Sequence, residues 1–282
     1  LPLPGETVLG SRYQNSAGGK GLNQAVACAR MGVPTAMIGA VGDDAHGHAL
    51  TELLRTESVD TARVRTRAEI RTGLAQVMLA ASGENSIVVH AGANASLSAE
   101  DVERDLPEAI VYLAQLETPL ETIEAFFEAA SQVGGCRVLN TAPAVTGSER
   151  LLPLADVLIM NATELAYYAG HAGAVSAAQV RRLGPRLLQR PQQALIVTLG
   201  AEGAWIFTHT SEEFIPATPT TVLDTTGAGD CFTGVLVAGL ALGQVLPEAA
   251  RRASRAASIA VTRLGAATSM PRVQELTASD SH

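Results

Sequence analysis

The sequence predicts an α/β protein in which helices flank a parallel sheet and a second, smaller sheet stands apart from it. The first observation is that short β-branched runs alternate with stretches of helical periodicity through the middle and C-terminal parts of the chain. That order is expected of strand–helix units around a parallel sheet. The second observation is that two strand-like runs between residues 73 and 91 follow each other around a polar turn.

Each expected strand is a short apolar run, and each expected helix is a longer stretch with helical spacing of apolar residues. Asp43 and Asp44 precede the second helix, where a carboxylate both caps the helix and meets the positive end of its dipole. The strands are expected at residues 35–41, 110–113, 137–140, 157–160 and 194–199. The helices are expected at residues 22–31, 46–57, 120–132, 177–189, 232–242 and 247–262.

The small sheet is expected from residues 73–79 and 86–91, which Ser82-Gly83-Glu84-Asn85 joins as a turn. A further strand at about residues 6–15 is expected to complete it. No internal repeat or low-complexity linker divides the chain, so a single domain is expected over residues 1–282.

Composition excludes several classes of protein. The 282 residues have 47% hydrophobic and 17% charged side chains, as in ordinary globular enzymes. With a net charge of -8 and no basic run, nucleic-acid binding is not expected. The most apolar stretch, residues 235–242, is too short to span a membrane. Cys28, Cys136 and Cys231 lack paired spacing and the first residues lack an export pattern, so reduced thiols in a cytoplasmic protein are expected.

The strongest motif is Asp224-Thr225-Thr226-Gly227-Ala228-Gly229-Asp230, which an apolar helix follows at once. Glycines before a helix let backbone N–H groups converge on an anion, and the helix dipole adds positive charge. Asp230 would then accept a proton from a hydroxyl while the Gly227–Gly229 backbone stabilises a transferred phosphoryl group. The alternative is an ordinary capped helix after a glycine turn.

A second glycine-rich run is Gly18-Gly19-Lys20-Gly21-Leu22-Asn23-Gln24, and Lys20 is the only lysine of the chain. The run is not a P-loop, because Gly21 follows Gly-Lys where Ser or Thr is required. It would let a small polyol approach the backbone, with Asn23 hydrogen-bonding its hydroxyls. The alternative is a turn that only begins the following helix.

Three further candidates follow strands, where ligands of parallel α/β sheets bind. Asn161-Ala162-Thr163-Glu164 offers oxygens to a hydrated Mg²⁺, although plain helix capping explains it as well. Thr198-Leu199-Gly200-Ala201-Glu202-Gly203 would accept a nucleotide or form a tight turn. Glu117 is a surface acid unless other residues give it a role.

Taken together and in this order, the motifs resemble the ribokinase family of carbohydrate kinases over nearly the whole chain. Residues 18–27 and 224–230 are similar to the family's two signatures. Two other runs, His90-Ala91-Gly92-Ala93-Asn94 and Leu116-Glu117-Thr118-Pro119-Leu120-Glu121, are similar to the ribokinases within it. The resemblance implies a Rossmann-like α/β core with a small β-sheet lid, and a homodimer in which the lid sheets of two subunits clasp.

The resemblance also implies a role for each motif. The general base would be Asp230, beside an anion hole of Gly227, Ala228 and Gly229. Ribose would be contacted by Gly19, Lys20, Asn23 and Glu117. ATP would be bound by Asn161, Thr198, Gly200, Gly203 and Gly229, with Ser254 near the adenine. Asn161 and Glu164 would organise Mg²⁺ through water, and an activating K⁺ would lie among Asp224, Thr226, Val261, Gly265 and Ser269.

The sequence departs from the family pattern in places. The family begins with an apolar strand that ends in an Asn-x-Asp pair gripping the sugar, and both are absent before residues 3–7. A truncated sequence is the expected reason; the alternative is a chain without that central strand. Ser254 stands where the family has Asn or His, and Cys231 where a hydroxyl residue is usual.

The activity that the resemblance implies is transfer of the ATP γ-phosphate to the 5-hydroxyl of D-ribose. Two alternatives remain open at the level of sequence. One is the same chemistry on another acceptor, such as a deoxy-sugar, a keto-sugar acid or a nucleoside. The other is a non-catalytic relative that only binds a sugar or a nucleotide.

Overall fold

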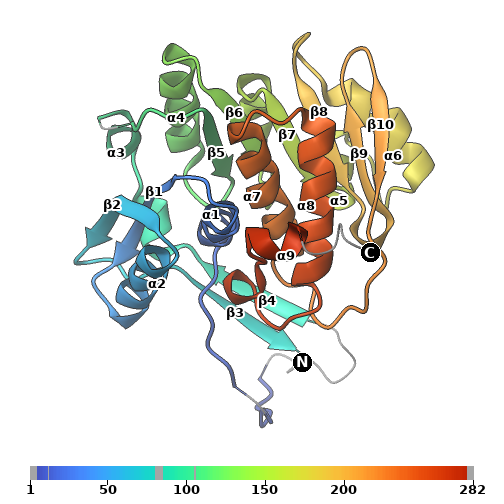
Figure 1. Ribbon diagram of the computed structural model, residues 1–282. Helices are drawn as coiled ribbons and strands as arrows, with labels where there is room; N and C mark the ends of the chain where they lie inside the picture. Colours follow the sequence, from blue (N-terminus) through green and yellow to red (C-terminus); the bar gives the residue numbers. More distant parts are fainter. Residues whose placement is uncertain (1–4, 12, 80–84, 105, 278–282) are drawn as a thin grey trace.

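The computed structural model describes residues 5–11, 13–79, 85–104 and 106–277, whose strands form three sheets with helices packed around them (Figure 1). The strands are β1 (Thr35–Gly42), β2 (Val59–Arg67), β3 (Leu74–Leu79), β4 (Asn85–His90), β5 (Val111–Gln115), β6 (Cys136–Asn140), β7 (Val157–Asn161), β8 (Ala194–Thr198), β9 (Gly203–Phe207) and β10 (Glu212–Pro216). The α-helices are α1 (Lys20–Arg30), α2 (Ala45–Thr56), α3 (Ala99–Glu103), α4 (Leu120–Gln132), α5 (Ala162–Tyr168), α6 (Ala177–Leu183), α7 (Ala228–Ala241), α8 (Leu246–Ala260) and α9 (Val273–Thr277).

The main sheet has six strands in the order β10-β9-β8-β7-β6-β5. The four strands from β5 to β8 run parallel, which confirms the predicted α/β core. At the other edge β9 and β10 run antiparallel, so the sheet is mixed there, which the prediction of a parallel sheet did not include. The carboxyl ends of the four parallel strands therefore lie along one edge of the molecule's core.

Helices cover both faces of this sheet, because side chains of a strand alternate between the faces and both sets are apolar. Val138, Ile159 and Ile196 join one hydrophobic cluster with buried residues of α1, α7 and α8. Leu139, Leu158 and other buried strand residues join a second cluster with α4, α5 and α6. Such a sandwich leaves the strand ends as the open polar edge where a ligand can bind.

The strands β1 and β2 form a separate two-stranded parallel sheet. Helix α2 connects them, and Asp44 caps this helix as predicted, with its carboxylate accepting from the N–H of Gly47. Helix α1 lies between this pair and the main sheet and packs on α7 (Figure 1). Residues of α1 thus reach the strand ends of the main sheet.

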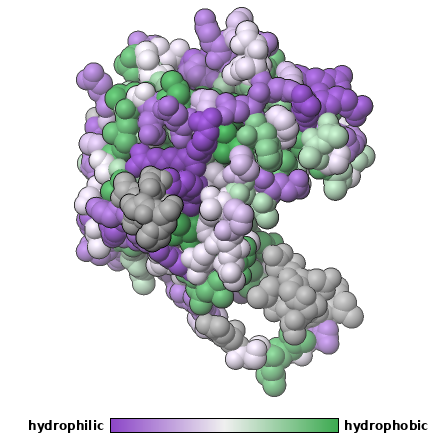
Figure 2. Space-filling model, turned by 45° about the vertical axis from the view of Figure 1, so that its right-hand side comes forward, coloured by the Kyte–Doolittle hydropathy of each residue, from purple (hydrophilic) through white to green (hydrophobic). Residues whose placement is uncertain are grey.

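A hairpin of β3 and β4 forms the third sheet, in antiparallel register with Leu74 opposite His90. It confirms the small sheet predicted at residues 73–91, while residues 80–84 of the expected turn lie outside the described residues. Figure 2 shows a hollow above the lower lobe, where the hairpin and the N-terminal segment project from the body.

The strand predicted at about residues 6–15 is wrong for the residues described there, since 6–11 and 13–15 contain no strand. A segment becomes a strand only when a neighbouring backbone pairs with its N–H and C=O groups. No described strand forms a ladder with this segment, and Leu9 is 99% exposed.

Most helix predictions agree with the structure, and α4 agrees at both ends. Helix α6 is shorter than predicted: it ends at Leu183 and passes into a 3-10 helix over Gly184–Leu187, where Pro185 has no N–H to continue the α-helical hydrogen bonds. Helix α7 begins at Ala228 rather than at the predicted residue 232. No helix in the described part of the chain is both long and apolar enough to cross a membrane.

Candidate active site

Four parallel strands end in polar residues at the same edge of the main sheet. Gln115 ends β5, Asn140 ends β6, Asn161 ends β7 and Thr198 ends β8. The strand register places Gln115 beside Asn140 and Asn161 beside Thr198. Amide and hydroxyl groups thus lie in a row along this edge of the sheet, next to the two hydrophobic clusters that cover its faces.

The predicted glycine turn leads into α7 over this edge. Gly227 is the N-cap residue, with a left-handed backbone at φ 76° that favours glycine. A side chain at Gly227 would also meet Cα of Ala266 at 3.1 Å, so the segment around Ala266 packs directly against the turn. The N–H of Ala228 donates to the carbonyl of Thr225 at 3.1 Å. Gly227 and Gly229 are thus the better placed of the predicted anion-hole donors.

Asp230 lies in the first turn of α7 and is 7% exposed. Its Oδ2 accepts a hydrogen bond from Nδ2 of Asn23 at 2.8 Å, and its Oδ1 accepts one from Nε2 of Gln24 at 2.9 Å. The structure therefore brings the predicted base and the predicted sugar ligand Asn23 together, although they are 207 residues apart in sequence. The carboxylate is held between α7 and α1.

Glu117 lies beside this pair, just after β5. Its Oε2 accepts a hydrogen bond from the backbone N–H of Lys20 at 2.8 Å and lies 4.0 Å from where a side chain at Gly19 would begin. Burial raises the pKa of Glu117, and the nearby charge of Asp230 raises it further, against the effect of Lys20. Four predicted sugar-site residues, Gly19, Lys20, Asn23 and Glu117, thus converge on Asp230.

Asn161 and Glu164 form a capping box at the start of α5. The N–H of Glu164 donates to Oδ1 of Asn161 at 2.9 Å, and the N–H of Asn161 donates to Oε2 of Glu164 at 2.9 Å. This geometry is the capping alternative of the sequence analysis. The pKa of Glu164 is raised by burial, and the charges of Lys20 and Asp230 act on it with opposite signs. The Glu164 carboxylate is therefore within electrostatic reach of the base.

The predicted nucleotide residues lie together at the adjoining corner. Thr198 pairs with Ala204 between β8 and β9, and Gly203 pairs with Pro216 between β9 and β10. Ser254 on α8 is buried and donates to the carbonyl of Pro216 at 3.4 Å. A side chain at Gly203 would meet the Ile215 carbonyl oxygen at 2.1 Å, so strand packing already requires this glycine. Gly200 begins a short 3-10 turn between Thr198 and Gly203.

The residues predicted around K⁺ lie in neighbouring turns. The carboxylate of Asp224 accepts hydrogen bonds from the N–H groups of Thr226 and Gly265, each at 2.9 Å. Although burial opposes it, these bonds hold the pKa of Asp224 below its usual range. The carbonyl of Val261 accepts from Leu223 and Asp224, which occupies both of its lone pairs, so Val261 fits a cation poorly. Ser269 donates to the carbonyl of Ala266 at 2.8 Å. In the described parts of the chain, no three His, Cys, Asp or Glu side chains form a metal-binding group.

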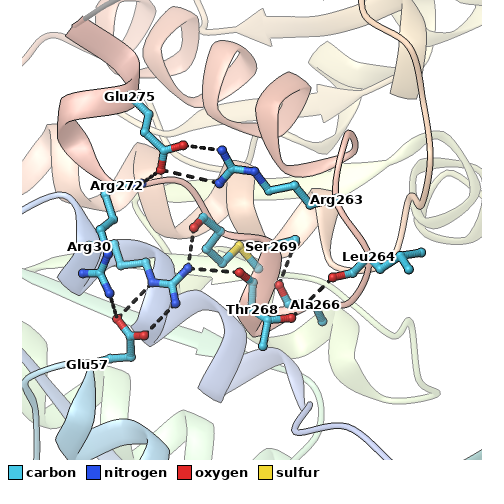
Figure 3. A network of polar contacts seen from close by, with 10 residues as sticks. Arg30, Glu57, Arg263, Leu264, Ala266, Thr268, Ser269, Arg272 and Glu275 are labelled. Carbon is cyan, nitrogen blue, oxygen red and sulfur yellow. Dashed lines mark hydrogen bonds and ion pairs between the residues drawn. The ribbon is translucent and has the colours of Figure 1, made fainter. Parts of the chain in front are cut away.

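A network of ion pairs and hydrogen bonds involves the segment 264–272, whose Ala266 packs against Gly227 (Figure 3). The guanidinium of Arg30 donates to both carboxylate oxygens of Glu57, at 2.9 and 2.6 Å. It also donates to the carbonyl of Thr268 at 3.3 Å and to that of Met270. Arg272 binds the same Glu57 carboxylate at 3.2 Å. Helix α1 is thereby tied to the segment that packs against Gly227.

Sequence reasoning missed the amide side chains behind the base, at Gln24, Gln115 and Asn140. The Nε2 of Gln24 bonds Asp230 and also Oδ1 of Asn140, at 3.0 Å, and Nε2 of Gln115 donates to Oε1 of Gln24 at 2.6 Å. A signal was present in the sequence, because Gln115 and Asn140 are the polar last residues of otherwise apolar strands.

Comparisons with known proteins agree with this geometry. Residues 1–273 match the model of the "pfkB family carbohydrate kinase". A ribokinase of Haemophilus influenzae is 38% identical over 280 residues, which cover 96% of this chain and 90% of that protein. A deoxyribokinase of Salmonella typhi is 30% identical, over 98% of this chain and 91% of that protein. The structure of Arabidopsis thaliana ribokinase complexed with ribose and ATP aligns with a TM-score of 0.89 at 31% identity, covering 100% of this chain and 93% of that one.

Proposed function

Since this chain belongs to the pfkB family of carbohydrate kinases, we propose that it is an ATP-dependent ribokinase, which transfers the γ-phosphate of ATP to the 5-hydroxyl of D-ribose. The observation that carries the proposal is the place of Asp230, in the first turn of α7 beside the glycine turn and against the sugar-site residue Asn23. The relatives that share this architecture over nearly their full length include a ribokinase bound to ribose and ATP.

In this mechanism Asp230 accepts the proton of the 5-hydroxyl as the sugar oxygen bonds to the γ-phosphorus and the bond to ADP breaks. Negative charge spreads over the transferred group, where the N–H groups of Gly227 and Gly229 at the helix start stabilise it. The buried position of Asp230 also excludes water that would compete with the sugar.

Ribose would be held by Gly19, Lys20, Asn23 and Glu117. Glu117 accepts from sugar hydroxyls while the N–H of Lys20 fixes its carboxylate. The hydroxyl groups of a small polyol suit such a set of amide and carboxylate groups, because each hydroxyl group offers both a donor and an acceptor. This site lies at the strand ends, beside the base.

ATP would bind across the ends of β7 to β9, where Asn161, Thr198, Gly200 and Gly203 lie together, with Gly229 at the phosphates and Ser254 near the adenine. This corner adjoins the base through Glu164, whose pKa responds to the charge of Asp230. A nucleotide placed here would direct its γ-phosphate toward the glycine turn.

The oxygens of Asn161 and Glu164 fit Mg²⁺ through water, because their direct partners are each other's N–H groups and Mg²⁺ retains much of its hydration shell. Bound there with the nucleotide, Mg²⁺ would neutralise phosphate charge. For K⁺, the donor set is reduced to Asp224, Thr226, Gly265 and Ser269. Asp224 would keep the turn ordered whether or not the ion is present, through its bonds to Thr226 and Gly265.

The hairpin would close over the sugar as a lid and pair with the hairpin of a second subunit. Val77, Ile87 and Val89 lie on one face of it by strand alternation and are 57%, 54% and 68% exposed. Such an apolar face favours association with a second copy. Sedimentation would show a dimer, and Val77→Asp would shift it to monomer. A cytoplasmic protein with its three cysteines reduced fits this enzyme, and all three are free in the structure.

A second acceptor is favoured by one observation, the 30% identity to a deoxyribokinase over 98% of the chain. Ribose and deoxyribose differ by one hydroxyl, so the discrimination depends on one hydrogen bond in the sugar site. ADP release measured with ribose, 2-deoxyribose, fructose and a nucleoside at equal concentrations would rank the acceptors, and ribose is expected to lead.

The proposal is tested by a coupled assay of ADP release with ribose and ATP, with and without Mg²⁺ and K⁺. Asp230→Asn should reduce turnover by about 10³-fold or more, because it removes the proton acceptor and keeps the shape. Thermal unfolding of the variant should stay near that of the wild type. A near-normal rate in Asp230→Asn would remove Asp230 from its role, and no ADP release with any acceptor would refute the kinase proposal.

A further inference from the structure

Three amide side chains, two of them buried and the third partly buried, form a hydrogen-bonded chain behind Asp230, and no part of the proposed reaction uses them. Gln24 on α1 is fully buried at 0% exposure, and Asn140 at the end of β6 is 8% exposed. Gln115 at the end of β5 completes the group. Amide groups shielded from water must hydrogen-bond to each other, so the orientation of the oxygen and nitrogen of one amide determines that of the next.

The direction of this chain is fixed from its Asn140 end. The carbonyl oxygen of Ile159 can only accept, and Nδ2 of Asn140 donates to it at 3.2 Å. Oδ1 of Asn140 therefore faces Gln24 and must receive a donor, which is Nε2 at 3.0 Å. The Oε1 of Gln24 is left for Gln115, whose Nε2 donates to it at 2.6 Å.

The consequence falls on the base. With its oxygen turned to Gln115, Gln24 presents Nε2 to Oδ1 of Asp230 at 2.9 Å. A reversed amide would direct an oxygen at a carboxylate oxygen, which is repulsive. Both Nε2 protons are then used, one on Asn140 and one on Asp230, so every polar atom of Gln24 has a partner.

We propose that Gln24 is a positioning residue for the base, and that Asn140 and Gln115 act through it by fixing the direction of its amide. The proposal rests on the proposed function and adds to it the residues that orient Asp230. The hydrogen bond from Gln24 fixes one carboxylate oxygen of Asp230, and the hydrogen bond from Asn23 fixes the other. The remaining lone pairs of the carboxylate are left for the sugar hydroxyl.

Other charges act on the same carboxylate and are present in every variant considered. Lys20 at the start of α1 is cationic, whereas Glu117 after β5 and Glu164 on α5 are acidic and interact with the charge of Asp230. Cys231, the next residue on α7, is buried, and burial raises the pKa of its thiol to about 12, so it stays neutral. Gln24→Met and Gln115→Met alter the dipoles near the base and leave these charges in place, whereas Gln115→Glu also adds a carboxyl group.

The first test is Gln24→Met, which keeps most of the side-chain volume and removes the donor. A hydrogen bond to a charged group corresponds to about 10- to 100-fold in an equilibrium, so kcat with ribose should fall by that order. The KM for ATP should change by less than about threefold, since Gln24 does not reach the nucleotide corner.

The second test uses the direction of the chain. Gln115→Glu keeps the shape of the side chain but offers an acceptor where Gln24 needs a donor, whereas Gln115→Met offers neither. The proposal expects Gln115→Glu to lower kcat more than Gln115→Met, and expects Gln115→Glu to add little in the Gln24→Met background. A packing role predicts the reverse order, because the isosteric variant fills the same space. Gln132→Glu, on the exposed end of α4, is the matched control and should match the wild type.

The outcomes separate this inference from the proposed function. Turnover of the wild type with ribose tests the proposed function. The variants are compared by kcat only if the wild type is active. Where turnover is absent, the side-chain amide protons of Gln24, followed by ¹⁵N NMR, should still exchange slowly and shift in Asp230→Asn. An unchanged kcat in Gln24→Met, or Gln115→Met more damaging than Gln115→Glu, would overturn the proposal, as would fast-exchanging Gln24 amide protons.

Discussion

Replacing Arg30 by Met is expected to destabilise the protein strongly, because Arg30 joins α1, α2 and the segment beneath the glycine turn. The side chains of Arg30 and Glu57 are 11% and 7% exposed, so the ion pair is largely shielded from water. Arg30→Met leaves the apolar stem and removes the bonds to Glu57 and to the carbonyls of Thr268 and Met270.

The expected loss of stability follows from the Glu57 carboxylate that remains without Arg30. Removing one partner of a buried ion pair costs about 3–5 kcal/mol, since the remaining charge stays buried without its counterion. Arg272 still reaches the Glu57 carboxylate at 3.2 Å and compensates in part. The lower end of that range, about 3 kcal/mol, is therefore expected for the loss in free energy of unfolding.

Urea unfolding of wild type and Arg30→Met, followed by circular dichroism, measures this difference directly. The matched control is Arg104→Met, whose pair with Glu100 is 72% exposed on both sides and should contribute less than about 1 kcal/mol. Equal losses for the two variants, or a loss below about 1 kcal/mol for Arg30→Met, would refute the claim that shielding makes this network strong.

Three further predictions concern pH, packing and thiol chemistry. Hydrogen bonds from Arg30 lower the pKa of Glu57, so the ionised Glu57 stabilises the fold above the usual glutamate range, and this stabilisation is lost as pH falls through the lowered pKa. The stability difference between wild type and Glu57→Gln, measured by urea titration, should therefore shrink on acidification. Gly203→Ala, with φ 125° and an Ile215 oxygen 2.1 Å from the added carbon, should cost about 2–3 kcal/mol and lower the Tm. Cys231 is fully buried with its pKa raised to about 12, so a thiol reagent at neutral pH should label it only after unfolding, while fast labelling of the native protein would contradict its burial.

The sequence predicted those elements whose signal is local. Helix α4 was predicted at both ends because Pro119 precedes it and its apolar spacing is regular. Strand β2 was missed because Arg63, Arg65 and Arg67 alternate along it and mask its apolar face. The antiparallel β9 and β10 were missed as well, since residues 198–203 were interpreted only as a nucleotide site or a tight turn and no strand was expected after them.

The site shows the same division between local and distant information. The glycine turn before Asp230 is a local pattern and was predicted. The bond from Gln24 to Asp230 spans 206 residues and the bond from Gln24 to Asn140 spans 116, so only the folded chain brings these groups together. For Asn161 and Glu164 the structure shows a capping box, and a role with Mg²⁺ stays a prediction.

The single lysine of the chain stands at the first residue of α1, with its backbone bonded to Glu117. An amine-reactive dye would therefore find only one side chain to modify, and that side chain belongs to the proposed sugar site. The native protein thus carries a built-in attachment point for a fluorescent reporter of ligand occupancy, with no engineering of the sequence.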